Sequence, residues 1–109
     1  GPSKVSVDEA NAFLATAFNR PNYQPSITLM EAGRAVQRLV ITEENLRPGG
    51  YISVPTQMSL ADSAAYMAVM TLVGIEPMTV TSNLNINFLR PCIGEVLIAD
   101  ARVMKIGQT

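Results

Sequence analysis

The segment from Pro55 to Val73 constrains the fold most, because its apolar residues surround the helix that it predicts and form no single stripe. Proline suits the first turn of a helix, and Ser53 or Val54 would cap it. Gly74 fits the C-terminal end. A helix that is apolar on all sides is usually enclosed by protein. In a chain of 109 residues, this requires a sheet that wraps around the helix.

A second, amphipathic helix is predicted near the N-terminus, after Ser6. Ser6 and Glu9 have the spacing of a capping box, in which each side chain bonds the backbone of the other residue. One apolar face recurs at helical spacing and consists of Ala10, Phe13, Leu14, Ala17 and Phe18. We expect this helix to lie on the outside of the domain.

Strand patterns occupy most of the remaining chain. Residues 26–42 predict a hairpin that turns at Glu31–Arg34, and residues 43–51 predict a polar loop. Alternation makes Met78–Arg90 the clearest strand, and Glu95–Ile106 predicts the last one. No later segment is present to pair with the last strand. We therefore expect either a longer natural chain or a neighbouring chain that covers its edge.

The sequence contains no histidine and a single cysteine, Cys92. The absence of histidine excludes Ser-His-Asp and Cys-His catalysis, histidine-ligated metals and any dehydratase with an imidazole base. A single cysteine excludes internal disulfides and cysteine-rich zinc sites. Proton transfer in an enzyme of this sequence therefore falls to carboxylates, hydroxyls, lysines or water. We expect no metal or redox cofactor.

The charges of the sequence indicate no partner. Eight basic and nine acidic residues give a formal net charge of −1 and are scattered along the chain. Nucleic-acid binding favours a basic stripe, so nucleic acid is not an expected partner. Gln57 and Asp62 interrupt the most hydrophobic stretch, which favours a buried helix over a membrane span. No secretion signal is visible, and we expect a cytoplasmic protein.

Asp62 is the only charged residue between Pro55 and Val73. It lies about two turns inside the predicted helix, too far from the start to be a cap. An ionised carboxylate in apolar surroundings is costly, and proteins tolerate one mainly where it does chemistry, such as general-base work. Alternatively, Asp62 faces solvent or pairs with Arg47 or Arg90. The spacing alone does not decide between these interpretations.

The other polar and sulfur-containing candidates have simpler interpretations. Thr81 and Asn83 alternate on a strand, which is typical of a solvated face. Cys92 has no histidine to activate it and fits a small buried residue. Three methionines fit either core packing or the lining of an adaptable apolar pocket: Met58, Met67 and Met70.

Two segments carry longer motifs. The segment Gly50–Ala64 reads GYISVPTQMSLADSA, and the segment Thr79–Pro91 reads TVTSNLNINFLRP. The first resembles a Gly-x-x-His-Gly-Gly followed four residues on by Leu-x-Asp-x-Ala, and the second a Thr/Ser-x-x-Leu-Asn-x-x-Phe-Leu-Arg-Pro strand. Both are signatures of hotdog-fold acyl-CoA thioesterases of the phenylacetate-pathway (PaaI-like) type, in the 4-hydroxybenzoyl-CoA thioesterase superfamily. The motifs also have that family's separation.

The resemblance implies an α+β hotdog fold, in which a curved antiparallel β-sheet wraps a long central helix. It implies a single hotdog domain over residues 1–109 that lacks the family's C-terminal strands. It also implies a homodimer or homotetramer. The Thr79–Arg90 strand would pair with its mate, and active sites would use residues of both chains.

Carried over position by position, the resemblance implies a set of catalytic groups. Asp62 falls on the family's catalytic carboxylate, and Thr81 falls on a hydroxyl residue that helps to position water. Val54 replaces the glycine whose backbone N–H polarises the thioester carbonyl. Asn45 is the candidate for a loop asparagine, although Arg47 occupies the position without a gap. The expected substrate-binding residues are Ser53, Pro55, Asn83 and Arg90.

The family's His-Gly-Gly is replaced by Ser53-Val54-Pro55 in this sequence. Ser53 does not reproduce the hydrogen bonds of an imidazole, Val54 adds a branched side chain, and Pro55 removes one backbone donor. The leading hypothesis is hydrolysis of an acyl-CoA or similar thioester. The first alternative is a hotdog protein that binds acyl-CoA or an acyl chain without turnover. A second alternative is a purely structural oligomer subunit.

Overall fold

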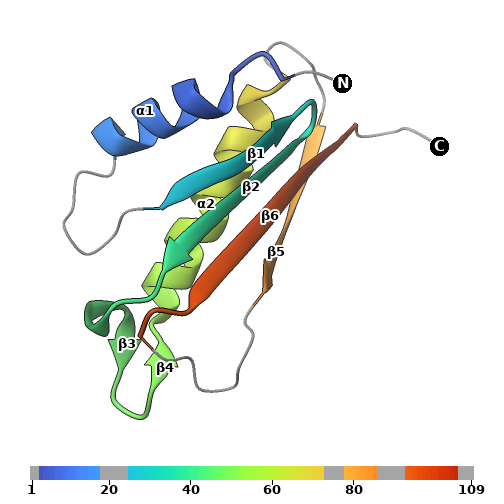
Figure 1. The fold of residues 1–109 in the computed structure, drawn as a ribbon. Helices are drawn as coiled ribbons and strands as arrows, with labels where there is room; N and C mark the ends of the chain where they lie inside the picture. Colours follow the sequence, from blue (N-terminus) through green and yellow to red (C-terminus); the bar gives the residue numbers. More distant parts are fainter. Residues whose placement is uncertain (1–2, 18–24, 73–77, 86–92, 106–109) are drawn as a thin grey trace.

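A long helix packed against an antiparallel sheet forms the centre of the fold (Figure 1). The computed structural model describes residues 3–17, 25–72, 78–85 and 93–105. The helices are α1 (Val7–Ala17), the 3-10 helix η1 (Glu43–Asn45) and α2 (Val54–Met70). The strands are β1 (Ser26–Glu31), β2 (Arg34–Val40), β3 (Leu46–Arg47), β4 (Tyr51–Ile52), β5 (Met78–Asn85) and β6 (Val96–Lys105).

The main sheet has the strand order β1-β2-β6-β5, and every neighbouring pair is antiparallel. β6 therefore lies between β2 and β5 and is hydrogen-bonded on both sides. The expectation that the last strand lacks a partner is wrong, because both of its neighbours, β2 and β5, come earlier in the chain. The two edges of the described sheet are β1 and β5.

The predicted hairpin is confirmed as β1 and β2, with register pairs from Ser26↔Arg38 to Glu31↔Arg34. Gly33 has a φ of 83° in the turn, a conformation that favours glycine. The Gly33 N–H donates to Thr71 Oγ1 at 2.7 Å, and this hydroxyl donates to the Ala68 carbonyl at 2.6 Å. The turn is thereby attached to the C-terminal end of α2.

The polar loop predicted over residues 43–51 contains more structure than expected. It forms η1 and a small hairpin, in which Leu46 pairs with Ile52 and Arg47 with Tyr51. Gly49 and Gly50 have φ values of 96° and 83° in its turn. This hairpin stands next to the start of α2 (Figure 1), because the Ser53 N–H donates to the Asn45 carbonyl at 2.9 Å.

The predicted start of the central helix is confirmed. Ser53 is the N-cap of α2, with its side chain accepting from the Thr56 N–H at 3.3 Å, and Pro55 lies in the first turn. The predicted end near Gly74 is too late, because α2 ends at Met70 with Thr71 as its C-cap. Gly74 itself lies outside the described residues. α2 contacts β1, β2, β5 and β6, so a single sheet face covers it.

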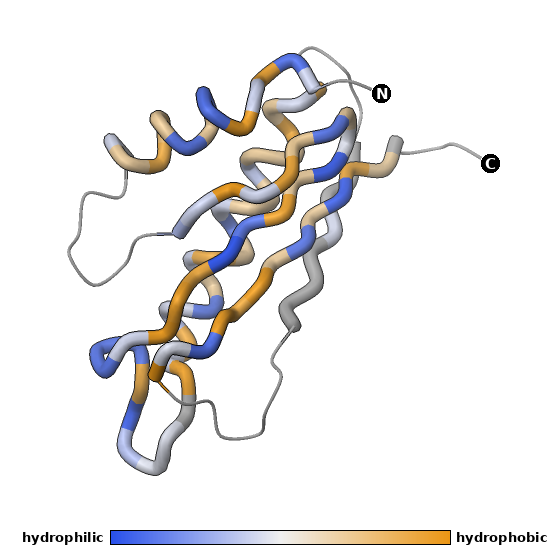
Figure 2. Tube along the Cα trace, viewed as in Figure 1, coloured by the Kyte–Doolittle hydropathy of each residue, from blue (hydrophilic) through white to orange (hydrophobic). Residues whose placement is uncertain are grey.

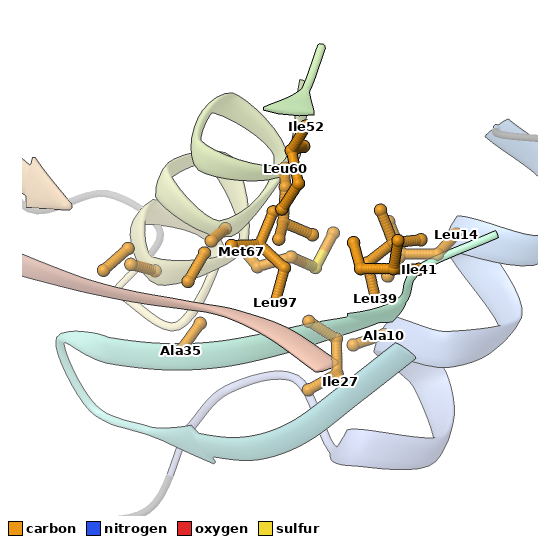
Figure 3. Packing of buried hydrophobic residues seen from close by; sticks show 14 residues of the cluster. Ala10, Leu14, Ile27, Ala35, Leu39, Ile41, Ile52, Leu60, Met67 and Leu97 are labelled. Carbon is orange, nitrogen blue, oxygen red and sulfur yellow. The ribbon is translucent and has the colours of Figure 1, made fainter. Parts of the chain in front are cut away.

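The core lies between α2 and the sheet and extends under α1 (Figure 3). Buried and more exposed residues alternate along β2, and the buried set faces this core. Figure 2 shows that both hydrophobic and hydrophilic residues occur along β2 and β6. The fully or nearly buried members include Leu39, Ile41, Leu60, Met67 and Leu97. The prediction that protein encloses α2 on most sides is not met within one chain. Met58 is 59% exposed and Tyr66 is 50% exposed.

α1 packs on the edge strand β1 (Figure 1). Its capping box is confirmed, since the Glu9 N–H donates to Ser6 Oγ at 3.1 Å and the Ser6 N–H donates to Glu9 Oε1 at 3.0 Å. Ala10 and Leu14 are buried, whereas Phe13 of the predicted apolar face is 45% exposed. Phe18 lies outside the described residues.

A helix on the concave side of a curved antiparallel sheet is the α+β hotdog arrangement that the resemblance implied. This arrangement leaves two places along α2 where a functional site can form. The N-terminal end of α2 meets the small β3–β4 hairpin, and the middle of α2 meets α1.

Candidate active site

A pocket of about 340 Å³ lies between α1 and α2. Its lining residues are Phe13, Leu14, Ser59, Asp62, Ser63, Tyr66 and Met67. The catalytic carboxylate proposed from the sequence therefore borders a cavity with mostly apolar walls. Of the predicted site residues, Asp62 is the one that the structure places in this pocket.

Asp62 is exposed in the single chain and stands in a row of exposed α2 side chains that recur every fourth residue. The row consists of Val54, Met58, Asp62 and Tyr66. Among the described residues, Asp62 makes no ion pair. Of the interpretations of Asp62 given above, the single chain therefore shows a carboxylate that faces solvent. Pairing with Arg47 is not observed, and Arg90 lies outside the described residues.

The N-terminal end of α2 offers one unused backbone donor. The Ser53 side chain accepts from the Thr56 N–H at 3.3 Å, and the Ser53 carbonyl accepts from the Gln57 N–H at 3.1 Å. Pro55 has no N–H. Within the described residues, this leaves the Val54 N–H without an acceptor, at a residue that is 64% exposed. The positive end of the helix dipole favours a developing negative charge at this donor.

Ser53 and Asn45 are buried at 4% exposure each, and their polar groups serve the local fold. The Ser53 hydroxyl also bonds Thr56 Oγ1 at 2.7 Å. Asn45 Oδ1 accepts from the Thr42 N–H at 2.8 Å and from Thr42 Oγ1 at 3.0 Å. Asn45 therefore lies next to the start of α2, with its side-chain oxygen turned into its own loop. Arg47, the alternative at this position, is exposed on β3.

The structure does not bring Thr81 to Asp62 within one chain. Thr81 is exposed on β5, its Oγ1 donates to the Arg102 carbonyl at 3.5 Å, and the two residues are register partners. The next residue of β6, Ala101, is buried against α2, so Thr81 and Arg102 lie on the opposite face of the sheet. Asn83 lies on β5 and is the register partner of Asp100 on β6. Cys92, like Arg90, lies outside the described residues.

Gln37 and Ser63 form a buried pair beside the pocket that sequence reasoning missed. Gln37 Nε2 donates to Ser63 Oγ at 2.8 Å, and Gln37 is completely buried. Within the described part of the chain, Gln37 Oε1 has no donor. The available signal was a glutamine at an inward position of β2, between the buried Ala35 and Leu39.

Three charged residues of the sheet, Arg34, Asp100 and Arg102, lie on the face opposite α2. Arg34 donates to both carboxylate oxygens of Asp100, at 3.1 Å from Nε and 2.8 Å from Nη2. These hydrogen bonds lower the pKa of Asp100 below its usual value, and the positive charges of Arg34 and Arg102 add to the effect. This cluster is therefore a structural ion pair, remote from the pocket.

Neither a metal site nor a membrane span is found in the part of the chain that the structure describes. No group of three or more aspartate, glutamate, histidine or cysteine side chains is placed to hold a metal ion there. No described helix is long and apolar enough to cross a bilayer. The lining residues of the pocket offer a carboxylate, hydroxyl groups and apolar side chains.

Comparison with known proteins gives a family match. The model of the thioesterase superfamily matches residues 49–109, which is more than half of the chain. Among solved structures, the chain is similar to the PaaI protein of E. coli from the phenylacetic acid degradation operon, with 15% identity and a TM-score of 0.49. That similarity covers 88% of this chain and 92% of the E. coli chain. No curated protein gives a significant match.

Proposed function

The chain belongs to the thioesterase superfamily, and we propose that it hydrolyses an acyl-CoA or a related thioester with Asp62 as the base. Water attacks the thioester carbonyl carbon while the Asp62 carboxylate takes one of its protons. The Val54 N–H holds the negative charge that develops on the carbonyl oxygen. The carbon–sulfur bond then breaks, and the leaving thiolate takes the proton from Asp62, which restores the carboxylate. The products are a carboxylic acid and a free thiol.

The observation that carries the proposal is the single open donor at the start of α2. Among the described residues, Ser53 and Pro55 leave only the Val54 N–H for an incoming carbonyl, and the Val54 side chain belongs to the same exposed row as Asp62. A backbone donor persists with any side chain except proline. The replacement of the family's glycine by Val54 is therefore compatible with the chemistry.

The distance between the two groups implies a site built by two chains. Val54 and Asp62 are eight residues apart on one straight helix, which separates them by about 12 Å along its axis. A base and an oxyanion donor must each lie about 3 Å from the reacting groups. One copy of α2 is therefore unable to supply both groups to one thioester.

A second copy solves this problem by symmetry. Met58 stands midway between Val54 and Asp62 on the exposed row. If two α2 helices pack antiparallel about a two-fold axis near Met58, the Val54 of each copy meets the Asp62 of the other. The row is apolar on both sides of Asp62, and β5 is an edge of the described sheet that a mate can extend. We therefore include a homodimer with two shared active sites in the proposal.

A second candidate function is binding of the thioester without turnover. The cap formed by Ser53 and the proline at position 55 reduce the helix N-terminus to one donor, Val54. The Ser53 hydroxyl is itself engaged with Thr56. A site with one oxyanion donor and no imidazole stabilises a tetrahedral intermediate less than a site with two donors, and this is the observation in favour of binding without turnover.

Release of free thiol from a panel of acyl-CoAs tests the proposal. Asp62→Asn is expected to lower kcat at least about a hundredfold, because general-base catalysis contributes that much or more. Asp8→Asn, which changes an exposed aspartate on α1, is the matched control and should retain the wild-type rate. Equal rates for wild type and Asp62→Asn would overturn the role of Asp62. Tight acyl-CoA binding with no thiol release across the panel would establish the binding function instead.

A further inference from the structure

The pocket beside Asp62 is polar at one end and apolar at the other. Ser59, Asp62 and Ser63 line the polar end. The apolar end lies one turn further along α2, at Tyr66 and Met67, which are about 6 Å beyond the polar residues along the helix axis. A thioester has the same order of groups, because its reactive carbonyl is followed by the acyl chain.

Two elements close the apolar end. Leu14 of α1 and Met67 of α2 form its floor and are each 2% exposed. Phe13 and Tyr66 form its rim, with ring centroids 5.8 Å apart and an angle of 23° between the rings. Both rings are still about half exposed, at 45% and 50%. The stacked rings therefore lie nearer the surface than the buried floor of the pocket.

We propose that this pocket holds the acyl chain of the thioester, and that Phe13 sets the longest chain that fits. The inference rests on the proposed function, because it takes Asp62 as the point where the carbonyl lies. The occupant is an apolar acyl group, since the walls beyond Ser63 are aromatic and aliphatic and carry no charge. A cavity of about 340 Å³ lies at the small end of ligand pockets, which favours a short chain.

The wall that would select the chain length, Phe13 and Leu14, lies outside the part of the chain that matches the family. That match spans residues 49–109 and includes α2, whereas Phe13 and Leu14 belong to α1. α1 is held firmly in place. The Asn11 side chain donates to the Ile27 carbonyl at 3.1 Å and accepts from the Ile27 N–H at 2.7 Å. These two hydrogen bonds fix α1 to the edge of the sheet and so hold Phe13 in position beside the pocket.

Acyl-CoAs from acetyl to dodecanoyl, assayed by thiol release, test the role of Phe13. Phe13→Ala opens the rim, and we expect the ratio of kcat/KM for decanoyl-CoA to that for butanoyl-CoA to rise about tenfold. Phe13→Trp should lower the same ratio. Thr16→Ala, at an exposed position on the same helix, is the matched control and should leave the ratio unchanged. The same acyl-CoAs are also titrated by calorimetry onto the Asp62→Asn protein, with and without Phe13→Ala.

The two readouts separate this inference from the proposed function. An unchanged chain-length profile in Phe13→Ala, with thiol still released, would overturn the role of Phe13 and leave the hydrolase intact. Chain-length-dependent binding that shifts with Phe13, but without thiol release by any form, would keep the pocket and overturn the hydrolase. Neither binding nor release with any acyl-CoA would overturn both.

Discussion

Gln37 Nε2 donates a 2.8 Å hydrogen bond to Ser63 Oγ, which joins the middle of β2 to the residue that follows Asp62 on α2. The contact crosses the core, because Gln37 is completely buried and Ser63 is 6% exposed. Gln37 Oε1 has no donor among the described residues. A buried carbonyl oxygen without a donor costs free energy. The pair therefore fixes the polar end of the pocket to the sheet while leaving the core less stable than an apolar one.

Removal of one partner should be worse than removal of both. Ser63→Ala leaves both polar ends of the Gln37 amide unpaired, and we expect it to lower the free energy of unfolding by about 1–3 kcal/mol. The double variant Gln37→Leu/Ser63→Ala replaces the pair with apolar side chains and should recover most of that loss. Urea denaturation of the wild type and the two variants measures both values. A double variant no more stable than Ser63→Ala would contradict this account.

Complementation between two inactive variants should detect the shared active site. Val54→Pro removes the N–H of the proposed oxyanion donor, and proline is tolerated at the first helical position. Ser53 has φ −61° and ψ 142°, which suits a residue that precedes proline. An equal mixture of Val54→Pro and Asp62→Asn forms mixed dimers with one intact site, so thiol release should return to about a quarter of the wild-type rate.

The control for this experiment is Val54→Ala, which retains the backbone N–H and should retain the rate. Each variant alone should remain inactive at the same total concentration. No recovery in a mixture that forms mixed dimers, checked by native mass spectrometry, would place the base and the donor of each site in one chain.

Asn11 should contribute to stability through the edge of the sheet. Its side chain pairs with the N–H and the carbonyl of Ile27 in the way that a neighbouring strand would. Asn11→Ala removes both bonds, and we expect a loss of about 1–3 kcal/mol with faster hydrogen exchange at the Ile27 amide. Asn11→Asp keeps the acceptor for the Ile27 N–H and should slow that exchange relative to Asn11→Ala. Identical exchange in all three proteins would refute the pairing.

The ion pair on the outer face of the sheet should make stability depend on pH. Arg34 lowers the pKa of Asp100 in the folded protein. A depressed folded pKa gives stability that is complete above the unfolded value, about 3.9, and is lost as the pH falls through the folded value. The stability difference between wild type and Asp100→Asn should therefore be largest near neutral pH and vanish in strong acid. Midpoints of urea denaturation, measured for both proteins from neutral to strongly acidic pH, give this difference. A difference that stays constant with pH would exclude the Arg34–Asp100 ion pair as the source of the pH dependence.

Local signals in the sequence predicted the elements of the fold well. Ser53 and Pro55 mark the start of α2, Ser6 with Glu9 marks the start of α1, and Gly33 marks the hairpin turn. Each signal acts through contacts between residues close in the chain, so the pattern alone carries it. Periodicity gives the faces of a strand but not its neighbours, and for this reason the central place of β6 was missed.

The site was less predictable, because its contacts join distant segments. Phe13 and Tyr66 meet only when α1 docks on α2, and Gln37 meets Ser63 across 26 residues. The apolar composition of α2 also allows two interpretations. Each apolar face of the helix can be covered by the chain's own sheet or by a second chain. The exposed row through Asp62 belongs to the face that the chain's own sheet leaves open.

The central position of β6 has a consequence for how the protein folds during synthesis. β2 leaves the ribosome with only β1 to pair with, and β5 leaves it with no neighbour in the described sheet until β6 follows. The four-stranded sheet therefore closes late, by contacts between segments far apart in the chain, which makes folding slow. During that interval α2 has no complete surface to pack on, and its apolar side chains are accessible to chaperones and to other nascent chains.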